Sequence, residues 1–182
     1  MERPNTTVLF MSTSTFSPAG AHEPAFFVVA VRKLILMTLL TGGLYGFYWY
    51  QRNWDIHYRA GGGIAVLYML WPEFFLYSLL SRVDLRIRAS GRNYVWSPWW
   101  LACGMLLASI LCIVLGVVSL PMPGVAKCAA LMFALSLLVL GAVQRAINFC
   151  ERDPEGTANA QFTVVNWLWI SMVTSGWVLL VG

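Results

Sequence analysis

The sequence predicts an all-α fold: an integral membrane bundle of about five transmembrane helices, with the N-terminus inside and the C-terminus outside. Three observations support this prediction. Hydrophobic residues make up 59% of the 182 residues and charged residues only 11%, whereas soluble domains average roughly 45–50% apolar and about 25% charged residues. Apolar runs long enough to cross a bilayer recur along the chain, and the basic residues lie in short clusters between them.

A domain of this size cannot hide so much apolar surface from water, because small folds have little interior. A membrane-spanning helix needs about 20 largely apolar residues, and a helix satisfies its own backbone groups in lipid. None of the apolar runs alternates as a β-barrel strand does. We therefore expect one transmembrane domain over residues 26–182, with helices near residues 26–50, 63–80, 99–120, 125–146 and 164–181.

Residues 1–25 are predicted to be a polar, poorly ordered tail. This tail lacks the basic start and apolar core of a signal peptide, so we expect the first apolar run to be an uncleaved anchor.

The basic residues predict the orientation of the chain. If all five segments cross, nine basic residues lie on one side, and only Arg52, Arg59 and Lys127 lie on the other. Loops rich in Lys and Arg remain inside, which places the N-terminus there. One alternative stays open: the first segment enters the membrane, turns at Gly42-Gly43 and returns to the same side. The remaining crossings then invert, and six basic residues lie on each side of the membrane.

Small residues at four-residue spacing predict faces where helices touch, because membrane helices associate through close backbone approach. The short connection "PMPG" also predicts that the third and fourth helices form an antiparallel hairpin. The GxxxG in the first helix is expected to pack against a helix of the same chain. The candidate packing residues are Gly42, Gly46, Gly104, Ala108, Cys112, Gly116, Ala126, Ala130 and Ala134.

Glu73 interrupts the apolar run "LYMLWPEFFLYSLL". A carboxylate at membrane depth is costly and commonly faces a bundle interior or a water-filled path. Glu73 is therefore a candidate proton or cation site, and Pro72 could loosen the helix beside it. The competing interpretation is structural: a protonated Glu73 hydrogen-bonded to Thr41, Tyr45 or Tyr77.

The stretch "SRVDLRIRASGR" carries four arginines just after the second predicted helix. Basic residues beside a cytoplasmic leaflet attract anionic lipid, although they also simply fix the orientation. The candidate contacts with anionic lipid headgroups are Arg82, Arg86, Arg88 and Arg92.

The stretch "KLILMTLLTGGLYGFYWYQRNW" resembles a group of small, uncharacterised multi-pass membrane proteins of bacteria, which carry a T-x-G-x-Y-x-x-Y-W motif. "PEFFLYSLLSRV" and "VQRAINFCERDPEGTANAQFTVVNWLWI" are similar to further segments of that group. Glu73 departs from it, because the group has small or apolar residues there. The resemblance implies a multi-pass protein of the bacterial inner (cytoplasmic) membrane and implies no reaction. In such a membrane, the orientation predicted from the basic residues corresponds to a cytoplasmic N-terminus and a periplasmic C-terminus. The matching motif residues are Thr41, Gly43, Tyr45, Tyr48 and Trp49, followed by Arg52, Asn53 and Trp54.

The sequence carries no nucleophile elbow, no phosphate-binding loop and no Cys/His ligand spacing. It therefore predicts no enzyme, metal site or cofactor, and its short basic clusters do not indicate nucleic acid binding. The leading hypothesis is a subunit or assembly helper that packs against other membrane proteins or against itself. The alternatives are a small-solute or proton-coupled transporter using Glu73 and, third, a membrane enzyme acting on lipid.

Overall fold

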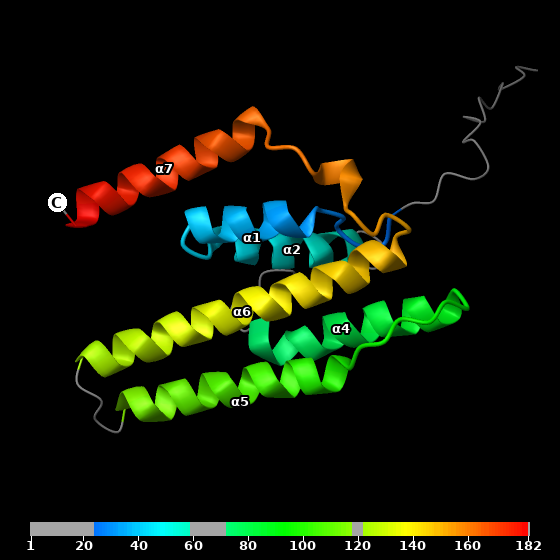
Figure 1. The fold of residues 1–182 in the computed structure, drawn as a ribbon, viewed down its shortest axis with the longest axis horizontal. Coiled ribbons are helices and arrows are strands. Elements are labelled where there is room, and N and C mark those ends of the chain that lie inside the picture. The colour runs from blue at the N-terminus through cyan, green and yellow to red at the C-terminus, as the bar shows by residue number, and fades with distance from the viewer. Residues whose placement is uncertain (1–23, 59–71, 118–121, 182) are drawn as a thin grey trace, which may run out of the picture.

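The computed structural model describes residues 24–58, 72–117 and 122–181. Within these ranges the chain forms six α-helices and one short 3-10 helix, and no β-strand. The all-α prediction is confirmed. The helices are α1 (Val31–Leu40), α2 (Leu44–Tyr58), α4 (Pro72–Ala89), α5 (Pro98–Val117), α6 (Met122–Cys150), η1 (Thr157–Asn159) and α7 (Val164–Val181) (Figure 1).

The prediction of one helix over residues 26–50 is wrong. Two helices, α1 and α2, occupy this stretch and fold back on each other as an antiparallel hairpin. The chain turns at Gly42 and Gly43, whose φ angles of 57° and 97° are readily adopted only by glycine. Gly46 faces α1, and a Cβ there would lie 3.4 Å from Thr38 Cγ2, which is an ordinary van der Waals contact. The backbone thus follows the returning path of the Gly42-Gly43 alternative.

Thr41 joins the two helices of the hairpin through its hydroxyl group. The hydroxyl donates to the carbonyl oxygen of Met37 (2.7 Å) and accepts from the backbone N–H of Tyr45 (3.0 Å). The hydroxyl therefore satisfies the backbone N–H of Tyr45 at the start of α2, where helices leave such groups unpaired, and adds a second hydrogen bond to a Met37 carbonyl that already accepts from the N–H of Thr41 (3.0 Å).

The other helices follow the predicted segments to different degrees. The bounds of α5, α6 and α7 lie within four residues of the predicted ones, and α5 and α6 form the expected antiparallel pair. The second predicted helix differs: α4 continues to Ala89, and residues 63–71 lie outside the described ranges. An ion pair between Asp84 and Arg88 at 2.7 Å supports this polar extension.

One described helix is long and apolar enough to span a membrane. It covers Pro123–Cys150, whose most apolar 18-residue stretch has a mean hydropathy of 2.1, and a shorter apolar helix covers Pro98–Leu111.

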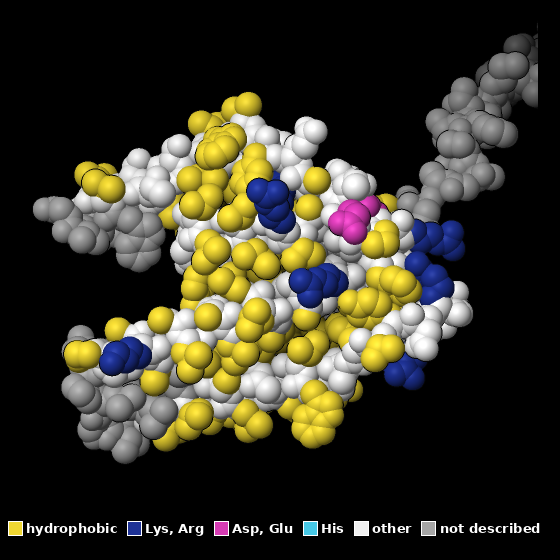
Figure 2. Space-filling model, viewed as in Figure 1, with side chains coloured by type: hydrophobic (Ala, Val, Ile, Leu, Met, Phe, Trp, Pro, Cys, Tyr) yellow, Lys and Arg dark blue, Asp and Glu magenta, His cyan; other side chains and the backbone are white. Residues whose placement is uncertain are grey.

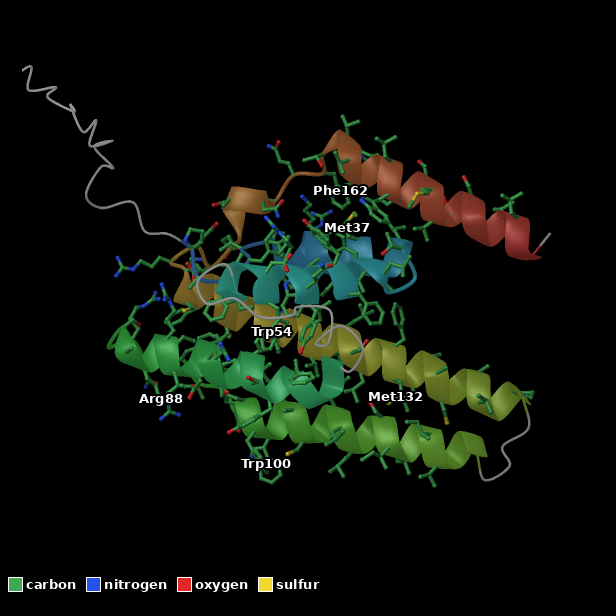
Figure 3. All side chains as sticks on the ribbon, turned by 180° about the vertical axis from the view of Figure 1, so that it is seen from behind. Met37, Trp54, Arg88, Trp100, Met132 and Phe162 are labelled. Atoms are coloured by element: carbon green, nitrogen blue, oxygen red, sulfur yellow. The ribbon has the colours of Figure 1, made fainter. Side chains whose placement is uncertain are left out.

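The core lies where the α1–α2 hairpin, α4 and α6 meet. Figure 3 shows side chains of these helices converging around Trp54, and Trp54 and Trp49 are almost completely buried. In contrast, α7 stands apart from the bundle (Figure 1), and among its described side chains only Ile170 and Val173 are buried. Other fully buried side chains of the core are Leu34, Met37, Leu80, Val83, Val143 and Ile147.

The basic residues of the described ranges gather toward one end of the molecule, which we call the arginine end. Figure 2 shows Lys and Arg side chains on that half and another far away, at the opposite end. Lys127, in the second turn of α6, lies at the opposite end. The other described basic residues lie at the arginine end, where α1 starts and where α2, α4 and α6 end. They are Arg32, Lys33, Arg52, Arg82, Arg86, Arg88, Arg92, Arg145 and Arg152.

Candidate functional site

The segment that precedes α1 is extended and runs beside α2 and α6. An extended strand without a neighbouring strand leaves its backbone groups unpaired, and such groups are costly when buried. Here side-chain amides replace the missing strand. The N–H of Phe27 donates to Asn53 Oδ1 (3.0 Å), and its carbonyl oxygen accepts from Gln144 Nε2 (3.1 Å).

Two further amides continue this pattern along the segment. Asn148 Nδ2 donates to the carbonyl oxygen of Val29 (3.0 Å), and Asn159 Nδ2 donates to that of Val28 (3.4 Å). We refer to Asn53, Gln144, Asn148 and Asn159 as the amide cluster.

Gln144 lies at the centre of the amide cluster and is completely buried. Its Oε1 accepts a hydrogen bond from the indole N–H of Trp49, and its Nε2 also donates to Asn148 Oδ1 (2.6 Å). Every hydrogen-bonding atom of this amide therefore has a partner, as a buried polar group requires. The arrangement ties α2, α6 and the extended segment together.

The loop between α6 and α7 closes over the same segment. Gly156, with φ 67°, lies so near it that a Cβ would stand 2.5 Å from backbone atoms of Val29 and Ala30. Asp153 holds the loop in shape by accepting from the N–H groups of Thr157 and Ala158, both at 2.9 Å. The hydrogen bond from Ala158, followed by that from Thr157, lowers the pKa of the Asp153 carboxyl.

Lys33 joins this loop to the first turn of α1. Its ammonium donates to Asn159 Oδ1 (2.7 Å) and to the carbonyl oxygen of Gln161 (2.6 Å), and the side chain is only 3% exposed. Beside it lies a cavity of about 720 Å³ between the hairpin and α7. We call it the α2–α7 cavity. Its lining residues are Phe27, Lys33, Thr41, Leu44, Tyr45, Phe47, Tyr48, Gln51, Asn159, Thr163, Val165, Asn166 and Trp169.

A second cavity, of about 330 Å³, lies on the other side of the hairpin tip. Gly42 and Gly46 line it together with Leu76 of α4, Met105 of α5 and Phe133 of α6. The glycines of the predicted GxxxG therefore face helices of the same chain. Since Phe133 lies near the middle of α6, the tip of the hairpin reaches only about half of the length of that helix.

The small residues at four-residue spacing on α5 and α6, which we call the small-residue ladders, are largely exposed. Gly104 is exposed, and nothing lies within 4 Å of the position that a Cβ would take. The α6 ladder is also exposed, at Ala126, Ala130 and Ala134. Ala108 of α5 is half-buried, and the side-chain environment at Cys112 and Gly116 lies outside the described part of the chain.

The glycine that α6 does use for intramolecular packing is Gly141, which the sequence analysis did not select. It is buried, and a Cβ there would lie 3.5 Å from Ile35 and 3.6 Å from Val31, both on α1. Gly141 follows Ala134 by seven residues, which is about two helical turns, so it belongs to the same face as the ladder.

The four candidate lipid-binding arginines have different surroundings. Arg82 lies over the Trp54 ring at 5.2 Å, and Arg88 pairs with Asp84. Arg92 caps the end of α6 by donating to the carbonyl oxygens of Phe149 (2.6 Å) and Cys150 (2.8 Å).

Arg86 is exposed on the last turns of α4, and Arg88 is also exposed there. Arg86 and Arg88 are thus the most accessible pair of the four. Glu73 belongs to α4, but its side chain lies outside the described part of the chain, so neither of its proposed roles is tested.

The structure brings together residues from separate stretches of the sequence. Trp49 from the first stretch of the resemblance bonds to Gln144 from the third, and Tyr45 lines the α2–α7 cavity with Thr163 and Asn166. The sequence analysis did not single out Lys33 or Asn159, and it named Asn53 only as part of the resemblance. The signal that could have found them is a lysine or an amide inside or beside an apolar run, where a polar group needs a partner.

In the described ranges, no three His, Cys, Asp or Glu side chains are grouped closely enough to hold a metal ion. No protein-family model, curated protein or solved structure matches the chain.

Proposed function

We propose that the chain is an integral membrane protein in which α5, α6 and α7 cross the bilayer. The apolar length of α6 supports this arrangement, as do exposed side chains such as Leu107, Leu138 and Leu179, which are 67%, 71% and 85% exposed. The α1–α2 hairpin enters from the arginine end and returns at about the middle of α6. This arrangement has three crossings where the sequence predicted five.

The distribution of charge supports a cytoplasmic arginine end. Nine described basic residues lie at that end and Lys127 alone at the other, and positively charged loops remain inside. The N-terminus is then cytoplasmic and the C-terminus lies outside. A location in the bacterial inner membrane rests on the resemblance of the first stretch.

Within the membrane, the protein acts as a subunit or assembly helper that binds a transmembrane helix of another membrane protein. The observation that carries this proposal is the open ladder of α6, at Ala126, Ala130 and Ala134. The same face holds α1 at Gly141, but the hairpin is too short to cover the first half of α6. Small residues on such a face permit close backbone approach in lipid.

The dimensions of this open face suit a helix. From Ala126 to Ala134 the ladder extends about 12 Å at 1.5 Å per residue. The last turns of α7 also stand apart from the bundle (Figure 1), and Val178 and Leu179 on them are 71% and 85% exposed. A partner helix lying on the ladder would continue the line of α1 beyond the tip of the hairpin.

The test is Ala130→Phe, with Leu131→Phe as the matched control. Both variants enlarge an exposed residue of the same helical turn, but only the first obstructs the ladder. The protein is purified in a gentle detergent and crosslinked. We expect the amount of crosslinked partner to fall roughly tenfold in Ala130→Phe, since overpacking a contact costs about 1–3 kcal/mol. Equal crosslinking of both variants, or a wild-type protein that is always solitary, would contradict the proposal.

No observation in the described residues favours the transporter or the lipid enzyme over this function. Glu73→Gln in reconstituted vesicles tests the transporter. Loss of proton or solute flux would support it, whereas the helper function predicts an effect on stability alone.

A further inference from the structure

The α2–α7 cavity has two chemically different ends. At the arginine end its lining comes from the first turn of α1, from η1 and from the start of α7, and these contribute Lys33, Asn159, Thr163 and Asn166. Toward the hairpin tip the lining includes Leu44. Aromatic side chains of α2 and α7 also line the cavity, namely Tyr45, Phe47, Tyr48 and Trp169. With about 720 Å³, the cavity falls within the range of small-molecule sites, roughly 300–1,000 Å³.

Lys33 supplies the charge at the polar end. Two of its three ammonium donors are used by Asn159 and Gln161, and the third has no acceptor in the described part of the chain. None of the residues that line the cavity is acidic. A charge held in a largely buried position attracts an opposite charge more strongly than one in water, so this site is suited to an anion.

The cavity lining offers further hydrogen-bond donors. The side-chain amide of Gln51 and the hydroxyl groups of Tyr45 and Tyr48 line the cavity, and none of them makes a hydrogen bond to a described residue. The starts of α1 and α7 lie at the same end, and helix N-termini carry a partial positive charge. Several donors and a cation therefore line one volume that contains no carboxylate.

The other end of the cavity is suited to a hydrocarbon chain. Phe47, near the hairpin tip on α2, and Trp169 on α7 line the cavity. Val165, which also lines it, stands at the start of α7 beside Asn166. Phe47, Val165 and Trp169 are 48%, 59% and 48% exposed, so the chain's own packing does not cover them. A fully polar anion would leave this apolar half without a partner.

We propose that the α2–α7 cavity binds an anionic amphiphile, with its acidic headgroup at Lys33 and its acyl chain along Phe47 and Trp169. An anionic phospholipid of the surrounding bilayer is the source that fits this chemistry. The inference rests on the bilayer placement proposed above but does not require the partner helix. This site is separate from the exposed arginines of α4.

The proposal can be tested on the full chain in a neutral detergent, without any partner protein. Native mass spectrometry would measure binding of phosphatidylglycerol, with phosphatidylcholine as the uncharged-headgroup comparison and inorganic phosphate as the free-anion comparison. We expect phosphatidylglycerol to bind at least about tenfold more tightly than phosphatidylcholine, and phosphate alone to bind weakly. Equal binding of the two lipids, or phosphate binding as tight as that of phosphatidylglycerol, would overturn the proposal.

Two variants locate the binding to this cavity. Lys33→Met removes the charge, and we expect roughly a tenfold or greater loss of phosphatidylglycerol affinity, in line with the strength of charge-assisted hydrogen bonds. Val165→Trp fills the cavity without touching the hydrogen bonds of Lys33, so it remains informative if Lys33→Met does not fold. We expect Val165→Trp to weaken the binding of both lipids.

Arg32→Met and Lys127→Met are the matched controls, because both remove an exposed cation that does not line the cavity. We expect each of them to retain the phosphatidylglycerol affinity of the wild type. Unchanged affinity in folded Lys33→Met and Val165→Trp proteins would overturn the assignment, and so would an equal loss in Arg32→Met. None of these results depends on whether Ala130 contacts a partner.

Discussion

At the scale of single residues, Gly156 determines how closely the loop after α6 can approach the extended segment. Its φ of 67° and the 2.5 Å separation between a Cβ and the backbone of Val29 and Ala30 exclude a side chain for two independent reasons. We expect Gly156→Ala to displace the loop and to lower the free energy of unfolding by more than the about 1–2 kcal/mol that a left-handed non-glycine residue costs. Thermal unfolding in detergent, followed by helical circular dichroism, measures this loss.

Gly91 provides the matched control for that experiment. Its φ of 69° is nearly the same, but nothing lies within 4 Å of the position of its Cβ. Gly91→Ala therefore carries the conformational cost without the backbone collision. If Gly156→Ala were no more destabilising than Gly91→Ala, the close contact with Val29 and Ala30 would not exist.

Individual polar residues were also the hardest part of the site to predict from the sequence. Lys33 and Asn159 are separated by more than a hundred positions, and their contact depends on the loop that Gly156 brings down onto α1. Gln144 and Asn148 stand one helical turn apart and share a face of α6, which the sequence does indicate. It does not indicate that their partners are backbone groups of an extended segment.

At the scale of elements, the amide cluster replaces the missing strand partner of the segment before α1. Gln144→Leu would leave the indole N–H of Trp49 and the carbonyl oxygen of Phe27 without partners. Each buried polar group that is left without a hydrogen-bond partner lowers the free energy of unfolding by roughly 1–3 kcal/mol. We expect the variant to unfold at a clearly lower temperature and the extended segment to become accessible to protease.

Gln51→Leu is the control for this loss. It makes the same chemical change on α2, but Gln51 forms no hydrogen bond to a described residue and is half-buried. We expect its unfolding temperature to stay close to that of the wild type. A similar loss in both variants would mean that the amide cluster adds nothing specific to the stability of the fold.

The helices themselves were predictable where composition and length were sufficient. The predicted and observed bounds of α7 coincide at residues 164–181, because a polar loop precedes a long apolar run. The hairpin was mispredicted because hydropathy along residues 26–50 is almost continuous, while the reversal depends on the backbone angles of Gly42 and Gly43. A pair of glycines is compatible with either a packed straight helix or a turn, and only tertiary contacts such as Gly46 with Thr38 select the turn.

At the scale of the whole molecule, the hairpin reconciles the charge distribution with the fold. A straight first helix places Arg52 on the side opposite Arg32, whereas the hairpin returns both to the arginine end. Arg82 over the ring of Trp54 brings the end of α4 to the same place. Charge and packing are thus both consistent with the proposed orientation, which has three crossings in place of the five that the sequence predicted.

Cysteine labelling tests this topology directly. In a chain whose native cysteines are replaced, we expect single cysteines introduced at Arg32, Asp55 and Arg88 to react with an impermeant maleimide from the cytoplasmic face, because all three lie at the arginine end. A cysteine at Lys127 should react only from the opposite face, since it lies at the start of α6. The position that discriminates is Asp55: labelling from the same face as Lys127 would mean that residues 26–50 cross the bilayer as one helix. Labelling from the same face as Arg32 would instead support the proposed hairpin, which enters the bilayer and returns at about the middle of α6.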